Sequence, residues 1–303
     1  MRPSRDARRA GFGPIQRSEV HATNVEKRGS RSRPRLSDVL CWTALLILLG
    51  MSLLPFAMML LLSLKTNADI FTRFWGLPQP ARWDFYREAA VALRGYLLNT
   101  LIVTVVVVPG VLLFSSLAGY ALARLHFRGR DEVFALIVAL MVVPGILTLI
   151  PTYALVQSMG LLNTRWALIL PYLAGGQVLG VVLCRTFFAS LPDELFEAMR
   201  LDGAGDFQIY RYLALPLSLP TLATIAIMST LGIYNDYIWP LVTISDSNLQ
   251  TFTVGVTRFA GEFNLDYGPT LAGYVIGSLP LIVLFAIGMR AFVQGVTSGA
   301  LKA

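Results

Sequence analysis

The side chains that usually carry catalysis are few in this sequence and lie away from its apolar segments. The two histidines, His21 and His126, fall in a basic N-terminal stretch and in a short basic loop. A catalytic Ser–His pair or a histidine-ligated metal at membrane depth therefore has no histidine available. The sequence also contains no G-x-x-x-x-G-K-[ST] phosphate-binding loop. We predict no catalytic residue, no metal site and no cofactor in this chain.

Uncharged polar and aromatic side chains near the apolar segments are the candidate contacts for a transported solute. Each buried amide would either bond to a neighbouring helix or face a solute path. The stretch 234–240 is aromatic and amide-rich, which is typical of membrane-interface belts and also suits sugar binding. Because the apolar segments contain almost no ionisable group, the set suits a neutral, hydroxyl-rich solute better than an ion. The candidate residues are Asn99, Gln177, Asn235, Asp236, Tyr237 and Trp239.

Residues 190–216 form a polar segment between two long apolar runs, so they are predicted to lie at a membrane surface. The spacing predicts a short helix over Pro192–Leu201, with acidic residues in its first turn, where the helix dipole favours them. Gly203 and Gly205 would allow the positive-φ turn that ends this helix, and Asp206 could cap a second one. The apolar stripe of the first helix consists of Leu191, Leu195, Ala198 and Met199.

The composition indicates an integral membrane protein that places this segment between helices. The chain has 303 residues, of which 55% are hydrophobic and 14% charged, and its mean hydropathy is +0.62. Backbone polar groups in lipid must bond within their own segment, so we predict an all-α fold with six transmembrane helices. The six predicted spans are Leu40–Leu64, Tyr96–Ala123, Val133–Met159, Ala167–Phe188, Leu217–Tyr234 and Leu271–Val293.

The distribution of charge gives the predicted orientation and domain organisation. Residues 1–36 are rich in Arg, Ser, Gly and Pro and are predicted to be a disordered tail, followed by one membrane domain over 37–303. With the N-terminus inside, most of the 25 Lys and Arg residues fall on the cytoplasmic side. Both termini and the segment 190–216 are therefore predicted to be cytoplasmic. This orientation accounts for the net charge of +7 without a nucleic-acid partner.

Residues 197–216 carry a family resemblance. Glu197-Ala198, followed by Gly203 six residues after Glu197 and by Leu215-Pro216, resembles the EAA loop of ABC-importer permeases, although Met199 stands where the family usually has Ala. The resemblance runs from about residue 38 to the end and is strongest to the carbohydrate-uptake branch, the maltose-type second permease. Its other motifs are Tyr120-Ala121-Leu122-Ala123-Arg124, Leu161-Leu162-Asn163-Thr164, Asn235-Asp236-Tyr237-Ile238-Trp239-Pro240 and Gly299-Ala300-Leu301-Lys302.

This resemblance implies a MetI-like fold of the type I importers in the bacterial inner membrane. It implies a permease subunit that moves a sugar or related polyol by alternating access. The expected partners are a second homologous permease, two ATPase subunits that bind ATP and Mg²⁺, an extracytoplasmic solute-binding protein and the lipid bilayer. By the same resemblance, 235–240 borders the outward gate and Gly295–Ala303 reaches the ATPase dimer. The implied ATPase-coupling residues are Leu195, Glu197, Ala198, Met199, Asp202, Gly203 and Pro216.

Three alternatives remain open at this point. A permease for another solute, such as glycerol phosphate, would need a basic residue facing the path. An intramembrane enzyme would need a catalytic set at depth, which the positions of the histidines oppose. A membrane scaffold without transport would need neither the proline-interrupted spans nor the loop pattern, and it would not co-purify with an ATPase.

Overall fold

The computed structural model describes residues 36–262 and 266–300, and the side chains of 38–262 and 266–289. Two predicted segments lie outside this description: residues 1–35 of the predicted tail, and the side chains of Gly295–Ala303. All regular elements in the described part are helical. In chain order they are α1 (Leu36–Leu62), α2 (Asn67–Thr72), α3 (Asp84–Arg124), α4 (Arg130–Leu140), the 3-10 helix η1 (Gly145–Thr148), α5 (Leu149–Ser158), α6 (Trp166–Ala189), α7 (Asp193–Leu201), α8 (Asp206–Ile209), the π-helix η2 (Tyr210–Ala214), α9 (Leu215–Leu217), α10 (Leu219–Asn235), α11 (Ile238–Thr243), α12 (Phe252–Glu262) and α13 (Tyr267–Ala300).

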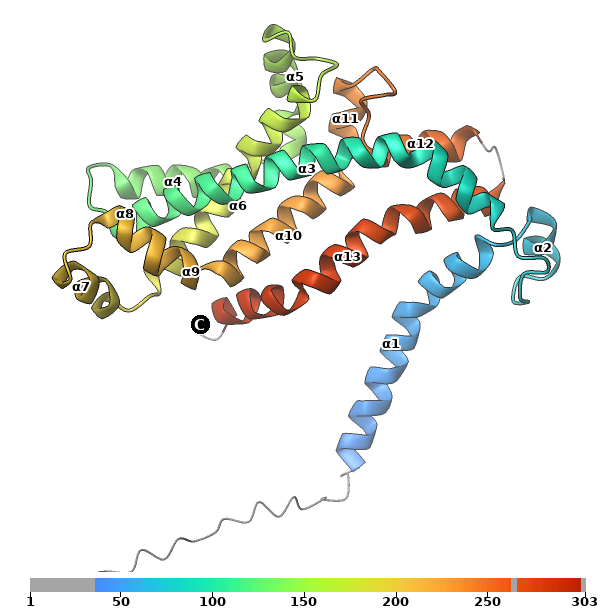
Figure 1. The fold of residues 1–303 in the computed structure, drawn as a ribbon, viewed down its shortest axis with the longest axis horizontal. Helices are drawn as coiled ribbons and strands as arrows, with labels where there is room; N and C mark the ends of the chain where they lie inside the picture. Colours follow the sequence, from blue (N-terminus) through green and yellow to red (C-terminus); the bar gives the residue numbers. More distant parts are fainter. Residues whose placement is uncertain (1–35, 263–265, 301–303) are drawn as a thin grey trace, which may run out of the picture. The chain divides into compact units, whose positions relative to one another are not determined.

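Residues up to Met51 and residues from Ser52 onward form two separate units, and all contacts below belong to the second. In this unit, α3 and α6 pack against each other, and α10 and α13 pack against α3 (Figure 1). A Cβ at Gly119 on α3 would lie 2.4 Å from the Cβ of Cys184 and 2.9 Å from the backbone nitrogen of Arg185 on α6. Only glycine permits this close approach of the two helices. The buried face of α3 continues as a stripe with a spacing of four residues: Val103, Val107 and Val111.

Four helices in the described part are long and apolar enough to cross a bilayer, namely α1, α3, α6 and α13. Two more spans result if each of two bent helix pairs counts as one: α4 with η1–α5, bent by 96°, and α8–α9 with α10, bent by 71°. The prediction of an all-α membrane protein is confirmed, with six spans on that count. The predicted span Val133–Met159 is interrupted because Pro144 disfavours helical backbone at the preceding residue, and α4 ends at Leu140.

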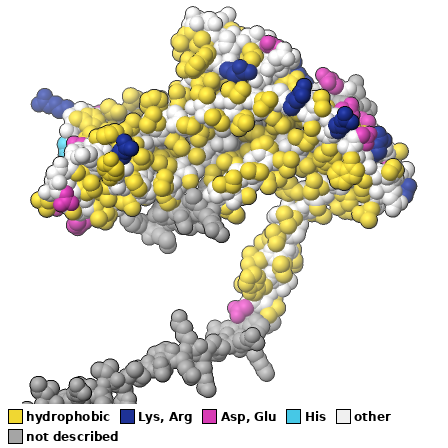
Figure 2. Space-filling model, in the orientation of Figure 1, with side chains coloured by type: hydrophobic (Ala, Val, Ile, Leu, Met, Phe, Trp, Pro, Cys, Tyr) yellow, Lys and Arg dark blue, Asp and Glu magenta, His cyan; other side chains and the backbone are white. Residues whose placement is uncertain are grey.

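The surface of the second unit matches a membrane environment. Figure 2 shows hydrophobic side chains over the flank formed by α3, α10 and α13, with charged side chains toward its margins. Large apolar side chains on α3, such as Leu98, Leu101 and Val105, are exposed rather than buried. In water such a patch would be unusual, whereas lipid covers it without cost.

Candidate functional site

The segment 190–216 forms two short helices joined by a glycine turn. Pro192 has extended backbone and precedes α7 as its N-cap, so α7 begins one residue later than predicted. At its C-terminus, Gly203 has a φ of +83°. Its N–H donates to the carbonyl of Arg200 (3.0 Å), and the N–H of Ala204 donates to the carbonyl of Met199 (3.0 Å). This pair of hydrogen bonds is a Schellman motif, which requires a left-handed residue where Gly203 stands.

The second helix begins differently from the prediction. Gly205 has a φ of −75°, so it does not share the positive-φ turn, and it serves as the N-cap of α8. Its N–H donates to Oε1 of Gln208 (2.9 Å), and Asp206 is the first helical residue instead of the cap. After α8 the chain widens into the π-helix η2, continues through α9, which contains Pro216, and then bends near Ser218 into α10.

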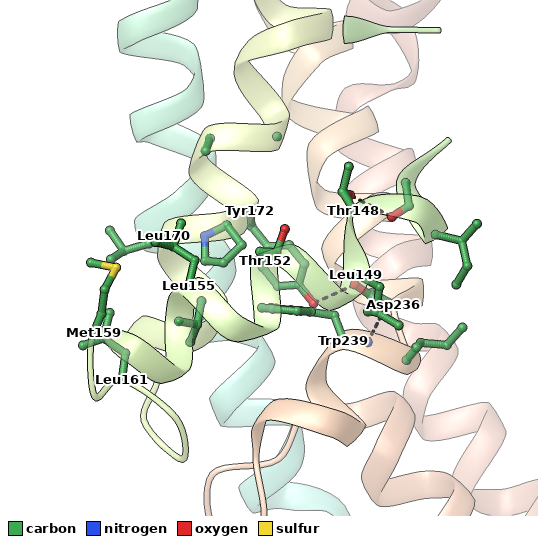
Figure 3. A pocket seen from close by; sticks show the side chains of 17 residues that line it. Thr148, Leu149, Thr152, Leu155, Met159, Leu161, Leu170, Tyr172, Asp236 and Trp239 are labelled. Atoms are coloured by element: carbon green, nitrogen blue, oxygen red, sulfur yellow. Dashed lines mark hydrogen bonds between the residues drawn. The ribbon is translucent and has the colours of Figure 1, made fainter. Parts of the chain in front are cut away.

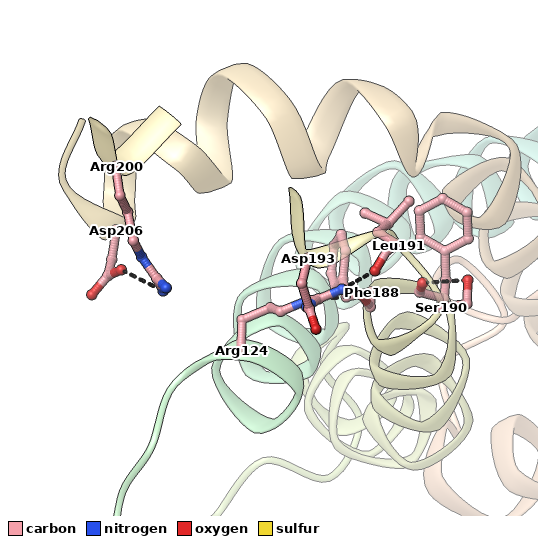
Figure 4. Close-up of polar contacts among 8 residues, drawn as sticks. Arg124, Phe188, Ser190, Leu191, Asp193, Arg200 and Asp206 are labelled. Atoms are coloured by element: carbon pink, nitrogen blue, oxygen red, sulfur yellow. Dashed lines mark hydrogen bonds and ion pairs between the residues drawn. The ribbon is translucent and has the colours of Figure 1, made fainter. Parts of the chain in front are cut away.

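A single arginine at the end of α3 holds α7 in place (Figure 4). Both Nε and Nη2 of Arg124 donate to the carbonyl of Phe188, at 3.0 and 2.7 Å, and Nη2 also donates to the carbonyl of Leu191. Its Nη1 pairs with the carboxylate of Asp193, and its guanidinium lies 4.0 Å from the ring centroid of Phe196. We call these contacts the Arg124 clamp. The planar guanidinium makes several bonds in one geometry, so the clamp fixes the last turn of α6 and the first turns of α7 against α3.

The same end of α3 also supports α8 and η2. Tyr120 packs against the rings of Phe188 and Tyr210, with centroid distances of 5.7 and 5.3 Å. Its hydroxyl donates to the carbonyl of Asp206 (3.3 Å), and the hydroxyls of Ser116 and Tyr210 bond to each other at 2.8 Å. The two short helices and the turn between them, with η2 and α9 (residues 193–217), are therefore mounted on α3 as one element, which we call the α7–α9 element.

Two cavities lie at the other end of α6. The larger, about 830 Å³, lies between η1–α5, the first half of α6 and the α10–α11 junction (Figure 3). The smaller, about 390 Å³, lies between α3, α6 and α10. Tyr172 and Asp236 line both. The hydroxyl of Tyr172 donates to Oδ2 of Asp236 (3.0 Å), and the N–H of Trp239 donates to Oδ1 (3.2 Å). Each carboxylate oxygen keeps capacity for a further hydrogen bond.

Comparisons with known proteins decide the family. Residues 96–298 match the family described as "Binding-protein-dependent transport system inner membrane component". The chain belongs to this family. It is 33% identical to the probable ABC transporter permease protein YurM of Bacillus subtilis, over 90% of this chain and 92% of that protein. It is 31% identical to the diacetylchitobiose uptake system permease protein NgcG of Streptomyces coelicolor, over 86% and 87% of the two chains.

A solved structure shares the fold. It is the crystal structure of a bacterial ABC transporter involved in the import of the acidic polysaccharide alginate, with a TM-score of 0.69 and 23% identity. The match covers 86% of this chain and 99% of that one. The chain is thus an ABC importer permease with a MetI-like fold.

In this permease the predicted coupling residues divide into an outward and an inward set. Met199 is half-buried and packs against the core together with Ala204. The exposed set consists of Leu195, Glu197, Ala198, Asp202 and Pro216. Sequence reasoning missed Phe196, which is almost fully buried beneath Arg124, and also Leu201 and Phe207, which are exposed apolar residues of the element. For the two residues of α7 the signal was available, because the 3.6-residue period places Phe196 and Leu201 about 140° apart, on opposite sides of the stripe that contains Leu195 and Met199.

The predicted solute-path residues do not form one group. Asp236 and Trp239 line the larger cavity, and Nε1 of Trp239 donates to the carbonyl of Ala167 on α6 (3.0 Å). Asn235 and Tyr237 are exposed beside them. The side-chain amide of Gln177 donates to the carbonyl of the residue four positions earlier in α6, at 3.2 Å.

Asn99 lies apart, in a network that joins three separate segments. Its Nδ2 donates to the carbonyls of Asn248 (2.6 Å) and Gln250 (3.1 Å), and its Oδ1 accepts from Nη2 of Arg165 (2.9 Å). The amide therefore connects α3 to the α11–α12 loop and to the start of α6. Of the two roles expected for a buried amide, Asn99 therefore has hydrogen bonds to neighbouring segments rather than a place on a solute path.

Proposed function

We propose that this permease is the sugar-translocating subunit of an ATP-driven importer in the bacterial plasma membrane. It works with a second homologous permease, two ATPase subunits that bind ATP and Mg²⁺, and an extracytoplasmic solute-binding protein. Its termini and the α7–α9 element face the cell interior. The observation that carries the proposal is α7, which exposes Leu195, Ala198 and Leu201 on one side while the Arg124 clamp holds its other side. A rigidly mounted helix with an exposed apolar edge suits a groove on another protein.

The α7–α9 element would convert closure of the ATPase pair into movement of the spans. An ATPase can shift the equilibrium between inward-open and outward-open states only by binding the two states with different affinity. Because α7 is tied to the ends of α3 and α6, any displacement of α7 acts on both spans together. ATP is hydrolysed by the partner subunits, and this chain supplies the path.

The cavities favour an uncharged saccharide as the solute. Relatives of this chain are named for diacetylchitobiose and for melibiose, raffinose and stachyose. The larger cavity has room for a small oligosaccharide, and its aromatic and hydroxyl groups come from Tyr172, Trp239 and Thr152. Among the residues that line these two cavities, Asp236 is the one charged side chain. A carboxylate accepts hydrogen bonds from sugar hydroxyls and disfavours a phosphate, which opposes the glycerol phosphate alternative.

Site-directed crosslinking tests the docking surface. In a Cys41→Ser background, Leu201→Cys and Ala198→Cys on α7 are expected to crosslink to the ATPase subunit in the assembled complex. The matched control is Leu77→Cys, an equally exposed leucine beyond the opposite end of α3. A crosslink from position 77, or none from either α7 position in an ATP-hydrolysing complex, would contradict the proposal.

A further inference from the structure

The segment between α1 and α3 has an apolar surface that neither the transport function nor the chain's own core uses. Four large apolar side chains between residues 71 and 83 are at least 67% exposed. Trp75 and Leu77 are 73% and 75% exposed, and Phe71 and Trp83 are exposed to a similar extent. We call these four residues the 71–83 surface. A segment free to collapse would bury such side chains, so their exposure needs a cause.

The segment is held in a fixed shape by a buried lysine. Lys65 is fully buried, and its Nζ donates to the carbonyls of Arg73 (2.8 Å) and Phe74 (2.9 Å). These carbonyls lie at the end of α2, so the ammonium group caps that helix favourably. The N–H of Arg82 donates to the carbonyl of Leu64 (3.0 Å), which closes the segment into a loop. The aromatic side chains are therefore presented by a folded structure.

The inner side of the same segment packs normally. Ile70 of α2 is buried, and Oδ1 of Asn67 accepts from the N–H of Tyr267 at the start of α13 (2.9 Å). The ring of Phe71 meets the ring of Tyr267 edge-on, with centroids 6.0 Å apart. Burial of Ile70 together with exposure of Phe71 shows that α2 has one face toward the protein and another left open.

The position of the segment identifies what covers the open face. α1 ends at Leu62 and α13 begins at Tyr267, so the segment lies where two apolar spans end, and the charged first turns of α3 begin beside it at Asp84. The hydrocarbon core of a bilayer must stop near the same level, and Trp and aromatic residues are enriched there. Arg73, which follows α2, lies 3.9 Å from the carboxylate of Asp69 but keeps 65% of its side chain exposed, so it can also reach the phosphate groups of lipids.

We propose that the 71–83 surface inserts into the headgroup region of the bilayer and fixes the depth at which α1 and α13 end in the membrane. Its ligand is the phospholipid interface, reached by Trp75 and Leu77 at the loop and by Phe71 and Trp83 beside the spans. The Lys65 capping interaction keeps these side chains outside the protein. This function is independent of which solute the permease transports.

Quenching of a fluorescent label at position 77 distinguishes whether this surface faces lipid, water or another protein. The full chain, with Leu77→Cys in a Cys41→Ser background, is labelled with NBD in its complex and placed in nanodiscs that contain lipids brominated near the headgroup or deep in the tails. The label at position 77 is expected to lose emission to shallow bromines more than to deep ones, and to be shielded from aqueous iodide. The matched control is Leu201→Cys on α7, which is expected to show no loss of emission to either lipid.

Two results would overturn the proposal. Quenching at position 77 by iodide instead of bromine would mean that the surface faces water. Shielding from both quenchers would mean that a protein, such as a solute-binding protein or a second permease, covers it. Because a polar label could itself alter the loop, native fluorescence provides a second measurement: Trp75→Phe should remove part of the emission that shallow bromines quench, and no such loss would count against the proposal.

Discussion

The Arg124 clamp allows a quantitative prediction for the substitution Arg124→Lys. Lysine keeps the positive charge but cannot bond to several acceptors in one plane. Two charge-assisted bonds to the carbonyls of Phe188 and Leu191 would be lost or weakened, each contributing about 1.5–3 kcal/mol. The pair with Asp193 adds little, because that carboxylate is 80% exposed. With one bond regained by the ammonium group, α7 should lose about 1.5–3 kcal/mol of the free energy that holds it against α3 and α6.

Amide hydrogen exchange measures that loss directly. A factor of ten in the exchange rate corresponds to about 1.4 kcal/mol, so amides in α7 should exchange roughly 10- to 140-fold faster in Arg124→Lys if they exchange through undocking of the helix. The assay is hydrogen exchange with mass spectrometry on the complex in nanodiscs, together with sugar uptake per ATP hydrolysed. On the coupling role proposed for α7, uptake per ATP should fall, because a loosened α7 would transmit less of the ATPase motion.

Arg128→Lys is the matched control for this experiment. Arg128 lies four residues further along the chain and makes no hydrogen bond or ion pair to the residues that the structure describes. The same substitution there should leave exchange in α7 unchanged. If Arg124→Lys also left α7 protection and coupling intact, the clamp would be an incidental contact and the reasoning about α7 would be wrong.

Three further substitutions test other parts of the fold. Gly203→Thr should cost about 1–2 kcal/mol from the positive φ alone and reduce coupling, whereas Gly205→Thr, at an extended N-cap position, should be tolerated in the same uptake and ATPase assays. Gly119→Ala should lower the melting temperature by an overpacking cost of about 1–3 kcal/mol, whereas Gly95→Ala on the same helix, with no atom within 4 Å of the added Cβ, should not. Asn99→Leu should leave buried polar partners unpaired and cost about 1–3 kcal/mol for each, seen as a lower melting temperature.

The sequence was informative where the determining interactions are local. The end of α7 at Gly203 follows from hydrogen bonds within five residues and from the one residue type that adopts a positive φ easily. The spans follow from apolar length alone. The prediction that Asp206 caps the second helix was wrong. Gly205 is the N-cap, because its N–H donates to the side chain of Gln208, and Asp206 is the first helical residue.

Contacts between distant segments could not be predicted in this way. Arg124 is separated from Asp193 by 69 positions, and Asn99 from Asn248 by 149. The spacing of apolar residues along a helix does not indicate which backbone carbonyl on another helix will accept a hydrogen bond from an arginine. The break after Leu140 was also underestimated, because a proline in an apolar run can either kink a span or interrupt it, and the local sequence does not distinguish the two.

The arrangement of α6 connects the two parts of the candidate site physically. One end of this helix gives the carbonyl of Phe188 to the Arg124 clamp, and the other carries Tyr172, whose hydroxyl bonds to Asp236 at the cavities. The two residues lie 16 positions apart, or about 24 Å along an α-helix. Close packing on α3 along this length, with Gly119 allowing backbone contact, restrains α6 from bending independently. A displacement of α7 should therefore reach Tyr172 as movement of a packed helix pair, and it would act there on the bond between Tyr172 and Asp236.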